Sequence, residues 1–182
     1  MPFEPLPDLA GLSLIDIARA VEERRLPPIE QWHPAETADS HMRIAADGTW
    51  FHEQRPISRP AMVRAFASLL MRDRQGQHWL VTPECRQSIA VEDAAFVAVD
   101  LKAEQGVLAF RLNTDELVIA GPEHRLRAEG DAETPAIYLE VQRGCEARLD
   151  RSTWLQLAEL AIASGNGLAV TSEGATFSLV PA

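Results

Sequence analysis

The amino-acid sequence predicts an α+β fold, with two repeated β-hairpin–helix–β units flanking an antiparallel β middle, plus an N-terminal helix. Three observations predict this class. The Asp47-Gly48 dipeptide separates two short runs of apolar and polar residues, as in a tight β-hairpin. An amphipathic helical pattern follows over residues 58–70, and then a β-prone run over residues 78–82. A similar hairpin, helix and strand recur near the C-terminus, which indicates an internal duplication.

The composition is that of a soluble globular protein. The chain has 182 residues, enough for one large domain or two small ones, and we expect units at residues 1–86 and 87–182. A net charge of -10 and a pI near 4.9 argue against binding to nucleic acid or to an anionic membrane, because both need a basic surface. A local basic pocket remains compatible with a small anion.

The sequence contains no apolar run long enough for a membrane helix, and its acidic N-terminus is unlike a secretory signal. Cys85 and Cys145 form neither a closely spaced pair nor a metal motif. We therefore expect reduced thiols in a cytoplasmic protein that is a monomer or a homodimer.

The N-terminal region predicts one helix between two irregular segments. Residues 1–12 are Pro-rich, and Ser13 is a good N-cap for a helix that extends to Arg25. Pro27-Pro28 ends this helix, and a polar linker to about Ser40 leads to the first hairpin.

The remaining elements follow from apolar patterns and turn residues. Ser58 is the expected N-cap of the first repeated helix, whose apolar face holds Met62, Val63, Phe66, Leu69 and Leu70. Strands are expected at residues 88–91, 94–102, 107–112, 116–120, 136–141 and 145–149. A second helix over 150–163 and a hairpin of residues 168–171 with 176–180 complete the chain.

The two repeated helices align at a shift of 92 positions, which places Ser58-Arg59 on Asp150-Arg151. An arginine beside a helix N-terminus is unfavourable by roughly 0.3–1 kcal/mol, because that end carries a partial positive charge. Arg59 and Arg151 are therefore candidates for an anion site together with free backbone N–H groups. The alternative is that each arginine pairs with a nearby acid or extends into solvent.

Four further residues are candidates for a ligand site, each with a structural alternative. Trp50 either packs in the core or stacks on a planar ligand. Asp47 and Asn113 are either turn residues or ligand contacts, and His124 either orients a ligand or lies on a loop. A metal site assembled from His41, His52 and Asp47 is conceivable, but we expect no metal. The sequence has no Gly-rich phosphate loop and no nucleophile elbow, and we expect no cofactor.

Seven motifs in order resemble the bacterial domain-of-unknown-function family 1285. They are DGTW (47–50), PISR (56–59), FASLL (66–70), LVTPE (80–84), VEDAAFVAV (91–99), RLNTD (111–115) and EHRLR (123–127). The resemblance implies an α+β protein of two small domains built from repeated motifs, with a part in signal transduction or small-molecule binding. This chain departs from the family pattern at His41, Gln54, Glu84 and Ala95.

These observations favour a non-enzymatic module that binds a small anionic ligand between the repeats, through Arg59, Arg151 and Trp50. The first alternative is a hydrolase that uses Asp47, His52 or His124, which requires two of these groups to meet in one pocket. The second alternative is a protein-interaction module that acts through a strand edge or an apolar patch.

Overall fold

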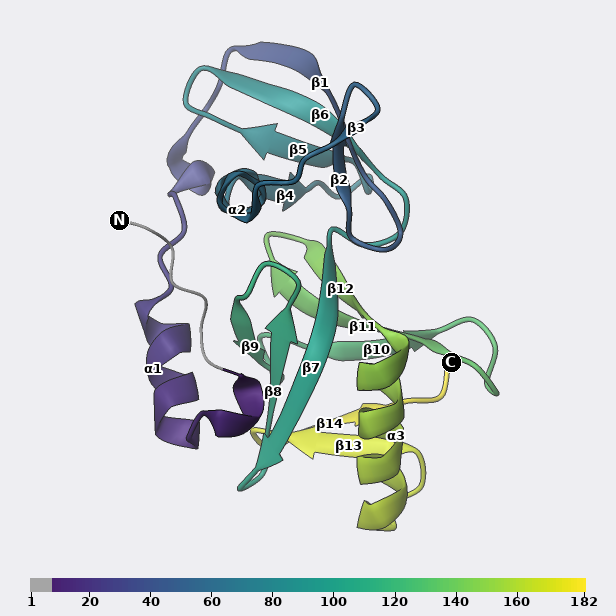
Figure 1. Cartoon of the computed structure of the whole chain (residues 1–182). Coiled ribbons are helices and arrows are strands. Elements are labelled where there is room, and N and C mark those ends of the chain that lie inside the picture. The colour runs from purple at the N-terminus through teal and green to yellow at the C-terminus, as the bar shows by residue number, and fades with distance from the viewer. Residues whose placement is uncertain (1–7) are drawn as a thin grey trace.

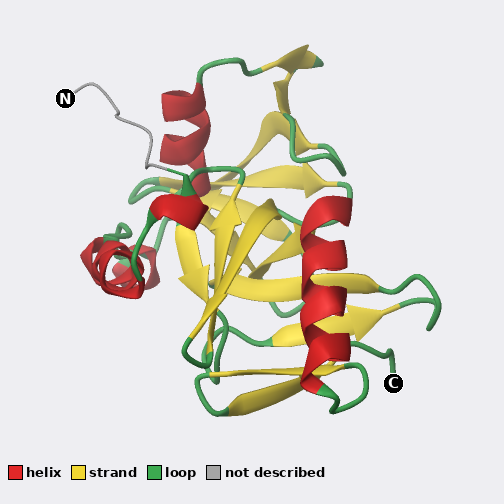
Figure 2. Ribbon diagram, turned by 60° about the horizontal axis from the view of Figure 1, so that its bottom comes forward, coloured by secondary structure: helices red, strands yellow, loops and turns green. Residues whose placement is uncertain are grey.

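The computed structural model describes residues 8–182 and consists of two six-stranded β-sheets, one above the other in Figure 1. The first sheet contains β1 (Glu36–Ile44), β2 (Trp50–His52), β3 (Arg55–Pro56), β4 (Leu70–Arg72), β5 (His78–Val81) and β6 (Cys85–Val91). The second contains β7 (Phe96–Glu104), β8 (Val107–Leu112), β9 (Leu117–Ile119), β10 (Leu126–Glu129), β11 (Ala136–Gln142) and β12 (Cys145–Leu149). A hairpin of β13 (Ala169–Ser172) and β14 (Ala175–Ser178) follows. The α+β class is confirmed, although strands predominate (Figure 2).

The two sheets share one topology. Their strand orders are β3-β2-β1-β6-β5-β4 and β10-β11-β12-β7-β8-β9, so each sheet joins two antiparallel meanders through one parallel pair. The parallel pairs are β1 with β6 and β12 with β7. Strands β1 to β6 therefore correspond to β7 to β12. The first and last strands of each set start 60 positions apart, at Glu36 and Phe96 and at Cys85 and Cys145.

This topology confirms two similar halves, but the predicted alignment at a shift of 92 positions is wrong. Helix α2 (Pro60–Ala67) lies between the third and fourth strands of the first sheet, whereas α3 (Arg151–Ser164) follows the sixth strand of the second. The predicted antiparallel middle flanked by two units is also wrong, because each half forms its own sheet. Amphipathic helices all share a period of about 3.6 residues, so two unrelated helices can align without gaps.

The helix starts follow local chemistry. Ser13 caps α1 (Leu14–Glu23), as predicted, and also forms a capping box with Asp16. Asp150 caps α3. Ser58 does not cap α2, and this prediction is wrong. The N-cap is Arg59, and no side chain caps the helix. A residue before proline is held in an extended conformation, and Arg59 precedes Pro60, so the helix cannot include Arg59.

Several strand segments differ from the prediction. The supposed polar linker before Ser40 is the outer part of β1, which begins at Glu36 and is exposed over its first four residues. Leu70 starts β4 rather than ending the helix, and β10 was not predicted. The first four residues of β1 are exposed and lack apolar alternation, while β4 and β10 are only three and four residues long, so sequence periodicity does not identify these segments.

One apolar core continues through both sheets, and a smaller cluster lies under the N-terminal segment. Ile17 of α1 and Leu9 of a short 3-10 helix (Leu9–Gly11) pack against Ala109 and Leu117 of the second sheet. The predicted irregular start lies outside the described residues up to residue 7. A second 3-10 helix covers Ile29–Gln31. Within residues 8–182, no helix is long and apolar enough to cross a membrane.

Candidate ligand groove

A groove of about 830 Å³ lies in the first half of the molecule. It lies between the β2–β3 hairpin and α2, and its floor includes residues of β1 and β6. It is lined by Ser40, Met42, His52, Glu53, Arg55, Pro56, Ile57, Ser58, Arg59, Met62, Phe66 and Gln87. A hollow of this size accommodates a small organic molecule.

Aromatic packing fixes the two walls of the groove to each other. The indole of Trp50, on β2, is only 2% exposed and stacks on the ring of Phe66 from α2 at a centroid distance of 6.3 Å. The Ile57 N–H donates to the Trp50 carbonyl at 2.8 Å, which holds the segment leading into α2 against the same strand. Trp50 is therefore a core residue that positions the groove, and it does not line it.

Three residues with positive φ occupy the β1 bulge and the β2–β3 turn, and one of them, Glu53, lines the groove. His41 has a φ of 57° where the pairing of β1 with β6 shifts its register, and Glu53 and Gln54 have φ values of 49° and 68° in the β2–β3 turn. The Glu53 N–H donates to the His41 carbonyl at 3.0 Å, so the turn and the bulge support each other. Positive φ at both central residues is usual for a two-residue hairpin turn, so Glu53 and Gln54 form a tight turn at this end of the groove.

The groove combines an apolar surface with two available cations. Met62, Phe66 and Ile57 supply apolar side chains beside the exposed guanidinium groups of Arg55 and Arg59. Neither guanidinium forms an ion pair or a hydrogen bond with another residue in the part of the chain that the structure describes. Because arginine binds carboxylate and phosphate groups in bidentate fashion, this rim can receive an anion.

The structure separates the two arginines that the sequence put forward. Arg59 lines the groove in the first half. Arg151 is the first residue of α3, and this helix packs on β7 and β12 of the second sheet (Figure 1). Arg151 is not among the residues that line the groove. The cationic partner of Arg59 in the groove is Arg55, which sequence reasoning missed because β3 is only two residues long.

Asp47 and Asn113 act in turns at the boundary between the two halves. Asp47 Oδ1 accepts the Thr49 N–H at 2.9 Å, and hydrogen bonding to Thr49 lowers the pKa of this exposed carboxyl. Asn113 Oδ1 accepts the Val97 N–H at 3.0 Å. Gly48 packs closely on Asn113, since a Cβ at Gly48 would lie 2.6 Å from its amide nitrogen. A smaller hollow of about 340 Å³ lies beside this contact.

The residues of the hydrolase alternative serve separate contacts. His124 Nδ1 lies 3.0 Å from the Glu140 carbonyl oxygen, His52 is exposed in the groove, and the Asp47 carboxylate accepts from its own turn. No hydrogen bond joins any two of these groups within residues 8–182. The same residues contain no cluster of three potential metal ligands.

Polar contacts from the second half hold the C-terminal end of α2. The Gln142 Nε2 donates to the Ala67 carbonyl at 3.0 Å, and the Arg143 Nη1 donates to the Ser68 carbonyl at 2.9 Å. The same guanidinium pairs with Glu30 at 2.7 Å. These donors satisfy carbonyl groups that a helix end leaves open, so the second half fixes the helix that forms one groove wall.

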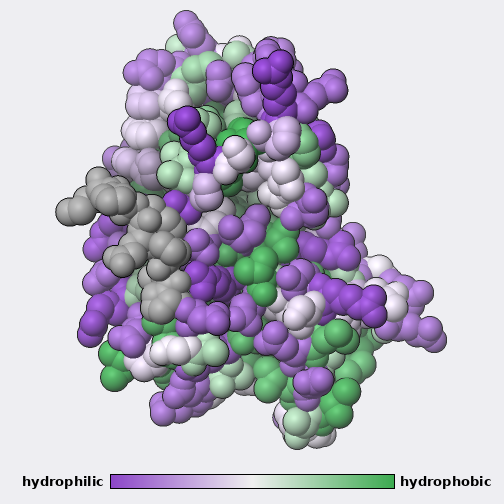
Figure 3. All heavy atoms as spheres, in the orientation of Figure 1, coloured by the Kyte–Doolittle hydropathy of each residue, from purple (hydrophilic) through white to green (hydrophobic). Residues whose placement is uncertain are grey.

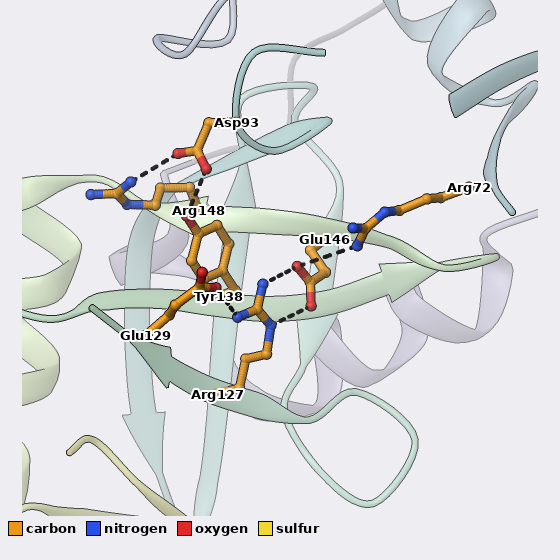
Figure 4. Close-up of polar contacts among 7 residues, drawn as sticks. All are labelled: Arg72, Asp93, Arg127, Glu129, Tyr138, Glu146 and Arg148. Atoms are coloured by element: carbon orange, nitrogen blue, oxygen red, sulfur yellow. Dashed lines mark hydrogen bonds and ion pairs between the residues drawn. The ribbon is translucent and has the colours of Figure 1, made fainter. Parts of the chain in front are cut away.

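A second polar cluster also joins the halves (Figure 4). The Tyr138 hydroxyl donates to Asp93 at 2.6 Å, and Arg148 pairs with the same carboxylate at 2.8 Å. Arg127 donates to both carboxylate oxygens of Glu146, at 2.7 and 2.8 Å, and these bonds raise its pKa above the usual range. Its guanidinium also lies 4.3 Å from the centre of the Tyr138 ring.

Arg72, from β4 of the first half, lies 4.0 Å from Glu146 and extends this cluster across the boundary, and Glu129 also pairs with Arg127. Each cation in the cluster therefore has an acidic partner, which makes the cluster a structural contact rather than an anion site. Sequence reasoning missed it because its members come from five separate segments.

Comparison with known proteins gives one family. Models of the DUF1285 N-terminal domain and of the DUF1285 C-terminal domain, both described as of unknown function, match residues 27–94 and 95–179. A crystal structure of a DUF1285 family protein from Silicibacter pomeroyi DSS-3 is 37% identical, with a TM-score of 0.75, over 93% of this chain and 95% of that one. A DUF1285 family protein from Shewanella baltica OS155 is 22% identical, with a TM-score of 0.53, over 65% of this chain and 90% of that one, and supports the fold alone. No curated protein matches.

Proposed function

Since this chain belongs to the DUF1285 family, whose function is not established, we propose from the groove itself that it is a non-enzymatic module of the bacterial cytoplasm that binds a small organic anion. The ligand would have an apolar body and a carboxylate or phosphate group. The observation that carries this proposal is the pair of unengaged guanidinium groups, Arg55 and Arg59, beside the apolar side chains of the groove.

The pair differs from the partly buried arginines of this acidic chain, whose net charge is -10. Arg43, for example, is partly buried and pairs with Glu92. Arg55 and Arg59 instead face the groove together. Glu53 is the acid among the lining residues, and it limits the site to ligands whose charge lies nearer the two arginines.

The two ends of α2 suggest how binding could serve signalling. Arg59 and Met62, toward the N-terminal end, line the groove, while the C-terminal end is held by Gln142 and Arg143 of the second half. A ligand that stabilises α2 therefore also stabilises the contact with the second half. Slower amide hydrogen exchange in the β11–β12 turn on ligand addition would support this coupling.

Thermal shift against short aliphatic carboxylates, aromatic carboxylates and nucleoside monophosphates tests the proposal. A ligand at 100 times its Kd stabilises the folded state by about 2.7 kcal/mol. Arg59→Gln and Arg55→Gln should each weaken binding by about 10- to 100-fold, because each removes a charge-assisted hydrogen bond.

Arg74→Gln and Arg151→Gln are matched controls, because both remove an exposed arginine away from the groove. They should leave the ligand-induced shift unchanged. The absence of stabilisation by any compound, or equal shifts in Arg59→Gln and the parent, would contradict the groove as an anion site. Loss of binding in Arg151→Gln would instead favour a site that includes both helix starts.

A further inference from the structure

Helix α3 has an exposed apolar stripe opposite the face by which it packs on the second sheet. Thr153, Leu157 and Ala161 form the buried face. On the opposite side, Leu155 is 50% exposed and Ile162 is 69% exposed. In Figure 3 apolar atoms gather around α3, at the lower right of the molecule.

The stripe has the spacing of a helix-packing surface. Arg151, Leu155, Ala158 and Ile162 follow at intervals of four, three and four residues, which places them on one side of the helix. Ala158 is small and lies midway between the two large apolar side chains, so another helix can approach closely there.

The charges of α3 match its dipole only in part, since Asp150 caps the N-terminal end but the next residue is a cation. Arg151 occupies the first position, beside the positive end of the helix dipole, and the first turn contains no acidic residue. At the other end, the last turn contains no basic residue to meet the free carbonyl groups. The helix thus has a cation at its N-terminal end, where a positive charge is unfavourable, and has none at its C-terminal end, where a positive charge is favourable.

We propose that this stripe is the interface of a homodimer in which α3 packs antiparallel to α3 of a second copy. A two-fold axis between positions 158 and 159 places Leu155 of each chain opposite Ile162 of the other, so the dimer contains this apolar contact twice. Arg151 then lies opposite position 166, just beyond the C-terminal end of the other helix at Ser164. Each copy supplies the cation that the other helix lacks, so the surface complements itself in charge as well as in apolar contact.

This interface is independent of the groove, since none of these residues lines it. One 14-residue helix is about 21 Å long at 1.5 Å per residue, and a single helix pair forms a small interface. We therefore expect a reversible dimer with a Kd in the micromolar range.

Sedimentation equilibrium of the whole chain over a range of concentrations tests the dimer. The parent should change from one chain of 20.1 kDa toward two chains as concentration rises. Ile162→Asp should weaken the dimer by at least about 100-fold, because it places a charge in an apolar contact that occurs twice. Ile15→Asp is the matched control, since Ile15 is 72% exposed on α1 and should leave the mass unchanged.

Arg151→Glu is a second test variant, and this substitution should not destabilise the folded chain. An acid at the first position of α3 favours the helix in its own chain, so the melting temperature at low concentration should rise. The same change should weaken the dimer by about 3- to 30-fold, since two helix-end contacts are lost. A structural role of Arg151 within one chain would not produce these opposite effects.

Cross-linking tests the antiparallel register. In a Cys85→Ser background, Ala158→Cys places two thiols beside the two-fold axis, and mild oxidation should give a covalent dimer. Ala163→Cys should not cross-link, because its two copies would lie about 13 Å apart along the helix axis. A single-chain mass at every concentration up to about 1 mM would overturn the proposal. A dimer that survives Ile162→Asp, or cross-linking by Ala163→Cys alone, would also overturn it.

Discussion

Gly144→Ala tests how tightly the two halves are joined. Gly144 lies in the β11–β12 turn with a φ of 80°, and a Cβ there would lie 2.6 Å from the carbonyl oxygen of Arg72 in the first half. That contact is shorter than van der Waals distance and involves backbone, so the turn must move. Movement would weaken the 2.9 Å hydrogen bond from the Arg72 N–H to the Arg143 carbonyl. We expect a loss of about 3 kcal/mol, combining about 1 kcal/mol for the left-handed conformation with about 2 kcal/mol for the displaced contacts.

Gly106→Ala and Gly174→Ala isolate the inter-half part of this loss. These glycines have φ values of 77° and 78°, close to that of Gly144, but a Cβ at either meets no atom within 4 Å. Each control should lose only about 1 kcal/mol, measured by urea denaturation. In a thermal scan this corresponds to a fall of about 2–4 °C for each control and about 6–12 °C for Gly144→Ala. Equal losses in the three variants would refute the proposed contact between the halves.

Three further outcomes follow from individual contacts. Burial lowers the pKa of His78 to about 4, so the unfolded state binds a proton before the folded state does as the pH falls. The free energy of unfolding should therefore decrease by about 1–2 kcal/mol between pH 6.5 and 4. In His78→Gln the free energy of unfolding should depend less on pH. Asp150→Ala should cost about 1 kcal/mol in urea denaturation, because the carboxylate caps α3, whereas Ser58→Ala should cost much less. Burial raises the pKa of Cys145 to about 12, so a thiol reagent at neutral pH should modify the partly exposed Cys85 and reach Cys145 only on unfolding.

The sequence predicted those parts of the fold that depend on neighbouring residues. The predicted N-cap at Ser13, the Asp47-Gly48 turn and the strands at Val107–Leu112 and Cys145–Leu149 match the structure because each depends on local dihedral preference or alternation. Strand partners depend on distant residues. The parallel pairing of β1 with β6 follows from where the chain returns after two meanders, and no local pattern encodes that.

The candidate site divides in the same way. Arg59 was identified because a cation beside a helix start is locally unfavourable, and it does line the groove. Arg55 was missed because its importance comes from the β2–β3 hairpin folding over α2. Arg151 carried the same local signal as Arg59, but the tertiary structure places it on another helix with different neighbours. A local signal can mark an unusual residue, whereas only the fold shows which residues share a surface.

The groove occurs where the two halves differ, and this gives a last prediction. The first half inserts α2 between its third and fourth strands, whereas residues 120–125 join the corresponding strands β9 and β10 directly. The wall that Arg59 and Met62 provide therefore has no counterpart in the second half. Met62 is 41% exposed, so Met62→Glu should leave the fold intact but reduce anion binding through lost apolar contact and added repulsion. Val180→Glu, at a residue that is 40% exposed, is the control for added surface charge in the same thermal-shift assay. If Met62→Glu binds the anion as well as Val180→Glu does, the ligand does not lie against α2, and a function that depends on the inserted helix is excluded.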